Sequence, residues 1–106
     1  MTIEQFLVSL REAKPHYDWE IRQATLIRGR FTAVGGYYHC PISAVYSHVT
    51  HNYSYAGQAT MNGLAMNLAG NTYSIINAAD GIEPYNRELR SQLLRAVGLD
   101  GAAEGV

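Results

Sequence analysis

Residues 17–22 read Tyr-Asp-Trp-Glu-Ile-Arg, so that apolar and charged side chains alternate with a period of two. This alternation predicts a β-strand with one buried face and one exposed face. Residues 26–34 are also rich in strand-forming types, and residues 23–25 would form the turn between the two strands. Gly35-Gly36 predicts a second turn before a short strand at Tyr37–His39. We therefore expect a small antiparallel hairpin or three-stranded meander over residues 17–39.

A helical pattern precedes this predicted sheet. Thr2 and Gln5 have the spacing of a capping box, and apolar residues then recur at helical intervals. We expect the helix to span Ile3–Ala13. Pro15 would end it by holding Lys14 in an extended conformation.

Three or four short helices are expected after the sheet. The first begins at Pro41 and would bury Ile42, Val45, Tyr46 and Val49, and the second spans Tyr55–Ala69. The third runs from Asn71 or Thr72 to a cap at Gly81. The last runs from Pro84–Asn86 to Val97 and ends with a cap at Gly98. Arg87, Arg90 and Arg95 would form a solvated face of the last helix. The predicted fold class is α+β and mostly helical, with an all-α fold as the alternative. Residues 1–99 would form one globular domain and residues 100–106 a flexible tail.

Charge is distributed very unevenly along the chain. The 8 basic and 9 acidic residues all lie in residues 1–30 or 80–106, so that Phe31–Ala79 contains no Lys, Arg, Asp or Glu. A segment of this length cannot be wholly buried in a domain this small, and it is rich in Tyr, Asn, Ser and His. Such uncharged surfaces resemble protein-binding surfaces, because Tyr offers a large contact area at low entropic cost. We expect binding residues here, namely Tyr37, Tyr38, His51, Asn52, Tyr53 and Tyr55. The alternative is a neutral surface whose tyrosines lie half-buried at the rim of the core.

Composition excludes or disfavours several classes of protein. The net charge of −1 disfavours bulk capture of nucleic acid or of an anionic membrane. One cysteine excludes an internal disulfide framework, and no apolar run reaches the roughly 18 residues of a membrane span. The N-terminus carries Glu4 and a helical pattern instead of the features of a secretory signal. We expect a cytoplasmic protein without a cofactor.

Cys40 is the single thiol, and it precedes Pro41 at a predicted helix start. The helix dipole would stabilise a thiolate there, which supports a cysteine-dependent enzyme or a redox-sensitive protein as an alternative function. A nucleophilic cysteine also needs a base within hydrogen-bond reach. His48 and His51 lie at or beyond the far end of the same helix, and the side chain of the adjacent His39 would diverge. We therefore favour a buried structural cysteine.

Two further candidate sites rest on residue pairs. His48 and His51 have the i,i+3 spacing of two metal ligands, although structural zinc usually needs four. Arg28 and Arg30, with neighbouring aromatic residues, would suit a single-stranded nucleic-acid binder, which the net charge disfavours.

No catalytic pattern is readable along the chain. Asp80 and Glu83 have the positions of helix-end carboxylates, and neither a Ser–His–Asp pattern nor a phosphate-binding loop is present. The favoured function is therefore a non-enzymatic module that binds a protein partner or a second copy of itself. Inhibitors and phage or mobile-element accessory proteins are the class of small protein we expect.

Overall fold

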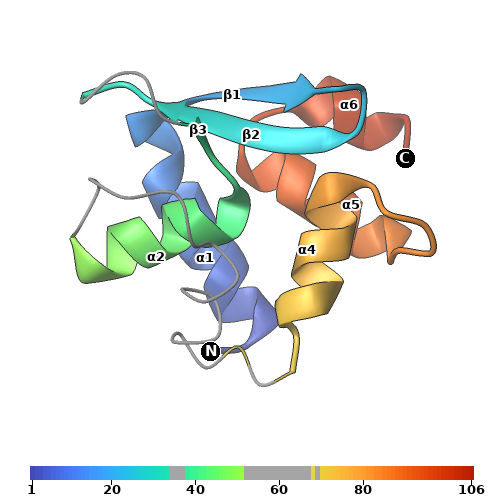
Figure 1. Cartoon of the computed structure of the whole chain (residues 1–106), viewed down its shortest axis with the longest axis horizontal. Helices are drawn as coiled ribbons and strands as arrows, with labels where there is room; N and C mark the ends of the chain where they lie inside the picture. Colours follow the sequence, from blue (N-terminus) through green and yellow to red (C-terminus); the bar gives the residue numbers. More distant parts are fainter. Residues whose placement is uncertain (34–37, 52–67, 69) are drawn as a thin grey trace.

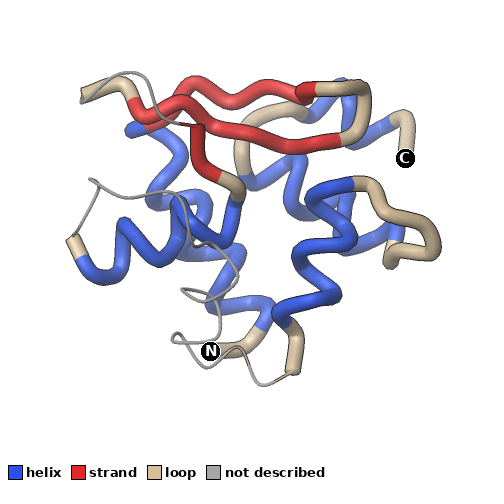
Figure 2. The backbone as a smooth tube through the Cα atoms, in the orientation of Figure 1, coloured by secondary structure: helices blue, strands red, loops and turns tan. Residues whose placement is uncertain are grey.

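The chain has an α+β fold in which helices cover one face of a three-stranded antiparallel sheet (Figure 1). The computed structural model describes residues 1–33, 38–51, 68 and 70–106. Figure 2 shows the strands along one side of the molecule and the helices beneath them. In chain order the elements are α1 (Ile3–Ala13), the 3₁₀ turn η1 (Lys14–His16), β1 (Tyr17–Arg22), β2 (Leu26–Phe31), β3 (Tyr38–His39), α2 (Pro41–Thr50), α4 (Thr72–Asp80), α5 (Arg87–Ala96) and α6 (Asp100–Glu104).

The sheet confirms the strand prediction over residues 17–22. β1 pairs with β2 along its whole length, from Tyr17 opposite Phe31 to Arg22 opposite Leu26. The charged residues of β1 are exposed, whereas its apolar residues are buried or half-buried. β3 is much shorter and pairs only with Gly29 and Arg30 of β2.

Gly29 allows β2 to lie flat under the ring of Trp19. The two residues are directly opposite in the β1–β2 register. A Cβ atom added at Gly29 would lie 2.8 Å from the nearest ring carbon of Trp19. No side chain fits there unless the indole moves, so glycine is needed at this position for packing.

Helix α1 begins with the predicted capping box, since the Thr2 side chain accepts from the Gln5 backbone and the Gln5 side chain accepts from the Thr2 backbone. Phe6, Leu7 and Leu10 are buried against the core. The prediction for Lys14 was wrong: its φ of −47° and ψ of −47° are helical, and the chain continues into η1. Proline disfavours a helical residue before it without forbidding one.

Helix α2 begins at the predicted residue, and helix α4 begins and ends close to the predicted residues. Pro41 is the first residue of α2, and Gly81 caps α4 with a left-handed φ of 68°. The predicted burial of Val49 was wrong, because its side chain is 47% exposed. Burial on α2 is concentrated in its first half and Ser47, so its last turn extends beyond the core. The predicted helix at 55–69 lies, except for Leu68, outside the described residues.

The sequence predicted that Arg90 of α5 belongs to a solvated face, and this prediction was wrong. Its side chain is buried, and its guanidinium donates hydrogen bonds to the carbonyls of Ala78 (2.7 Å) and Ala79 (3.2 Å). These carbonyls lie at the end of α4, where the partial negative charge of a helix stabilises a cation. Arg87 and Arg95 are exposed, as expected.

The C-terminal residues, which the sequence predicted as a flexible tail, are mostly helical in the structure. They form the short helix α6, whose Ala103 is buried in the core. The Ser91 hydroxyl on α5 also donates to the Ala103 carbonyl at 3.4 Å. Gly98 (φ 82°) ends α5 as predicted and turns the chain back, so that two small alanines can pack against the helix.

Candidate functional site

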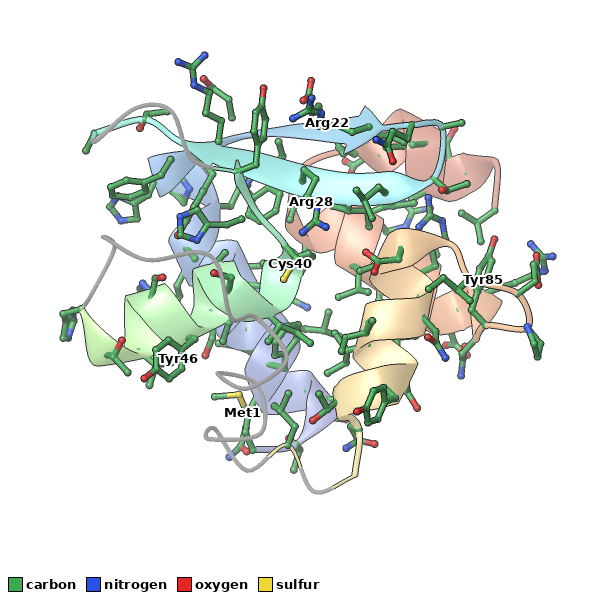
Figure 3. The ribbon with its side chains drawn as sticks, viewed as in Figure 1. Met1, Arg22, Arg28, Cys40, Tyr46 and Tyr85 are labelled. Carbon is green, nitrogen blue, oxygen red and sulfur yellow. The ribbon has the colours of Figure 1, made fainter. Side chains whose placement is uncertain are left out.

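A pocket of about 130 Å³ lies where β2, the start of α2 and the end of α4 meet. Three of its lining residues carry reactive or charged groups, namely Arg28, Cys40 and Asp80. The others provide a mostly apolar wall of Pro41, Ile42, Ile76 and Ala79. Figure 3 shows the Arg28 side chain extending from β2 toward the side on which Cys40 begins α2. The pocket therefore combines a guanidinium, a carboxyl and a thiol over aliphatic carbon.

Cys40 caps the N-terminus of α2. Its Sγ accepts a hydrogen bond from the Ser43 backbone N–H at 3.4 Å. Burial raises the pKa of the Cys40 thiol, and this effect exceeds the opposing influence of the Ser43 N–H and of the Arg28 charge. The helix start thus does not produce the low-pKa thiolate that a nucleophilic cysteine requires.

Arg28 reaches the pocket because β3 is short. The last pair of the β2–β3 ladder joins Gly29 to His39, after which the chain turns into α2. Beside Arg28 there is therefore no further strand residue of β3, and its half-buried side chain lines the pocket instead. Among the described residues, its guanidinium has no hydrogen bond or ion pair.

Asp80 is the last residue of α4 and faces the same pocket. Burial raises the pKa of its carboxyl, and the positive charges of Arg28 and Arg90 act against this rise. Arg90 gives its hydrogen bonds to the α4 carbonyls, as described above. Within the described part of the chain, the Asp80 carboxylate also forms neither an ion pair nor a side-chain hydrogen bond.

His39 points to the opposite side of the β3–α2 junction. Its Nδ1 lies 3.0 Å from the Ser43 hydroxyl, and its ring packs 5.1 Å from the ring of Tyr17 and 6.3 Å from that of Phe31, measured between centroids. Burial lowers the pKa of this imidazole, with the Ser43 hydrogen bond opposing the shift. None of these contacts lines the pocket. The side chains of His39 and Cys40 diverge, as the sequence predicted.

The two histidines considered as metal ligands lie near the end of α2. His48 is half-buried, whereas His51 is exposed and caps the helix in a left-handed conformation (φ 57°). In the ranges that the structure describes, no group of three or more His, Cys, Asp or Glu side chains is placed to hold a metal ion.

The predicted binding surface is described only in part. Tyr38 is 38% exposed on the outer face of the sheet, with the Arg22 guanidinium 4.1 Å from its ring centroid. His51 is also exposed. Arg30 is exposed on β2 and does not line the pocket that holds Arg28. The other predicted contact residues, Tyr37, Asn52, Tyr53 and Tyr55, lie outside the described residues.

The sequence did not group Arg28, Cys40 and Asp80. Part of the grouping follows from the ladder, because extending the Gly29–His39 pair by one residue sets Arg28 beside Cys40. Nothing in the sequence fixes where α4 ends relative to β2. Thr25 and Gly81 lie close together at this contact, since a Cβ atom at Gly81 would lie 2.6 Å from the Cβ of Thr25.

None of the described helices combines the length and the apolar character of a membrane-spanning helix. Comparison of the chain with known protein families, with curated proteins and with solved structures finds no match.

Proposed function

We propose that the chain is a non-enzymatic binding module that contacts a protein partner or a second copy of itself. The contact surface would come from the uncharged segment Phe31–Ala79. On this proposal the protein works in the cytoplasm, where a single unpaired cysteine stays reduced. An inhibitor or an accessory protein of a phage or mobile element would suit such a module.

The exposure of large apolar side chains in this segment supports the proposal. Six such side chains are exposed in the described part of the chain, and three of them, Tyr38, Val49 and Tyr73, belong to the uncharged segment. Tyr73 is the most exposed of the six, at 62%. Because Val49 and Tyr73 have no charged neighbour in sequence, desolvating them on contact costs little, whereas the ring of Tyr38 lies beside the Arg22 guanidinium.

The chemistry of Cys40 weakens the main alternative. A cysteine enzyme needs a thiolate and a nearby base. In this chain burial raises the pKa of the thiol, and the ring of the adjacent His39 contacts the Ser43 hydroxyl and does not line the pocket that Cys40 borders. The binding proposal requires neither feature.

The proposal is tested by replacing residues of the segment and comparing the variants with one in which exposed residues outside the segment are replaced. The first variant combines Val49→Ser with Tyr73→Ser, and a second combines Tyr53→Ala with Tyr55→Ala. Sedimentation equilibrium measures self-association, and pull-down from the native host measures capture of a partner. We expect at least one of the two variants to lose the association that the parent chain shows.

The matched control combines Val8→Ser with Ile82→Ser, since these side chains are 50% and 51% exposed and lie outside the segment. This variant should associate as the parent chain does. Association that survives both segment variants, or that the control removes equally, contradicts the proposal. A parent chain that is monomeric and captures no protein contradicts it as well.

A further inference from the structure

We propose that the pocket formed by Arg28, Cys40 and Asp80 binds a small aliphatic amino acid or a closely similar zwitterion. The carboxylate of the ligand would lie against Arg28 and its ammonium group against Asp80. Its aliphatic group would contact Ile42 and Ile76. Most residues that line the pocket belong to the uncharged segment, whereas its two charged groups, Arg28 and Asp80, lie outside that segment. Ligand binding at the two charged groups and protein binding through the exposed side chains are independent proposals.

Arg28 and Asp80 give the pocket a positive and a negative charge, and the two side chains do not form an ion pair with each other. Arg28 nevertheless acts on Asp80 electrostatically, since burial raises the pKa of the Asp80 carboxyl and the charge of Arg28 opposes this rise. The two groups are therefore near enough to act on one ligand and are not joined to each other.

The hydrogen-bonding capacity of both groups remains available. A guanidinium offers five N–H donors and binds a carboxylate in a two-point geometry. Among the described residues, Arg28 uses none of these donors. Asp80 does not exhaust its acceptors on Arg90, because that side chain donates to the carbonyls of Ala78 and Ala79.

The size and wall of the pocket select the ligand class. A volume of about 130 Å³ is close to that of a cavity that accommodates one benzene molecule. The wall away from the charges consists of Ile42, Ile76, Ala79 and Pro41. A ligand of this size that satisfies a cation, an anion and an aliphatic wall is a short amino acid with a branched apolar side chain.

The test is a titration of the full chain with L-valine, followed through backbone ¹H–¹⁵N chemical shifts. We expect saturable shifts at Ile42, Ile76 and Asp80, which line the pocket. Two matched probes each lack one charge of valine: isobutylamine has no carboxylate, and isovalerate has no ammonium group. Each should bind about tenfold more weakly or worse, because a charge-assisted hydrogen bond is lost.

Variants then assign the contacts. Arg28→Gln should weaken valine binding by about tenfold or more, and Asp80→Asn should act in the same direction. Arg30→Gln is the control, since Arg30 lies on the same strand, is exposed and does not line the pocket. It should leave the affinity unchanged.

Three results would overturn the proposal. The first is the absence of saturable shifts with valine, as expected if Arg28 and Asp80 close on each other in solution. The second is isovalerate binding as tightly as valine, which would show an anion site alone. The third is valine binding that Arg28→Gln does not change. The two probes act on the unaltered chain, so the test holds even if a variant fails to fold.

Discussion

The two sides of the His39–Cys40 peptide differ in packing, in polarity and in the direction in which burial shifts the pKa of their titratable groups. On one side, the His39 ring is surrounded by Tyr17 and Phe31 and is 1% exposed. On the other side, Cys40 borders a pocket that also contains Arg28 and Asp80. We refer to these as the packed side and the pocket side of the junction.

This difference arises where a strand becomes a helix. Successive side chains of a strand point to opposite faces, so that His39 packs against Tyr17 and Phe31 whereas Cys40 lines the pocket between β2, α2 and α4. Cys40 then occupies the N-cap of α2, where its sulfur is held by the Ser43 N–H. Two neighbouring residues that could form a catalytic pair are thus assigned to separate regions by backbone geometry. Substitutions that change volume or charge on the packed side should therefore alter the stability of the fold. On the pocket side the measurable property is the reactivity of the thiol.

The largest effect is expected from Gly29→Ala, next to the packed side. The new methyl group would lie within 3 Å of three Trp19 ring carbons, so the indole or the strand must shift. Overpacking of this kind costs about 1–3 kcal/mol. Urea unfolding followed by tryptophan fluorescence measures both the loss of stability and the movement of the ring.

Gly101→Ala provides the matched control. Gly101 lies in α6, and no atom would contact its added Cβ within 4 Å. The same change should there be neutral or stabilising by up to about 1 kcal/mol, since alanine is the better helix former. Equal losses in the two variants would show that the Trp19 contact is not responsible.

The packed side could be predicted from the sequence much better than the pocket side. The alternation at residues 17–22 gives both the strand and its buried face, because strand periodicity is a local property. The capping box at Thr2 and the cap at Gly81 are equally local. Burial of Arg90 was missed, because it depends on carbonyls of another helix. The pocket was missed for the same reason, since its groups come from three elements.

A smaller effect is expected from pH, through His39. Burial lowers the pKa of this imidazole below its ordinary value of 6.5. In the unfolded chain His39 gains a proton as the pH falls through 6.5, whereas in the folded chain it stays neutral until a lower pH. The contribution of His39 to stability is therefore fully present above pH 6.5. It decreases as the pH falls from 6.5 to the lower pKa of the folded chain. The slope is at most about 1.4 kcal/mol per pH unit, the limit for a single proton.

Comparison with His39→Gln isolates this contribution, because the remaining titratable groups are common to both chains. Asp80 acts in the opposite sense: its raised pKa means that the folded chain binds the proton first. Urea midpoints measured from about pH 7.5 to about pH 5.5 should fall more steeply for the parent chain than for the variant. Equal slopes would show that His39 is not buried as a neutral group.

The last prediction concerns the reactivity of the Cys40 thiol on the pocket side. It is measured as a rate of alkylation and not as a change in stability. Because burial raises the pKa of the thiol, less thiolate is present at neutral pH than in the unfolded chain. We expect alkylation by iodoacetamide, followed by mass spectrometry, to be several-fold slower in the folded chain than in urea. The pH midpoint of the rate should also be higher, and this second measure does not depend on how easily the reagent enters the pocket. A folded-state midpoint below that of the unfolded thiol would identify Cys40 as an activated nucleophile. In that case the helix N-terminus and Arg28 would outweigh burial, and the cysteine-enzyme alternative would replace the binding module.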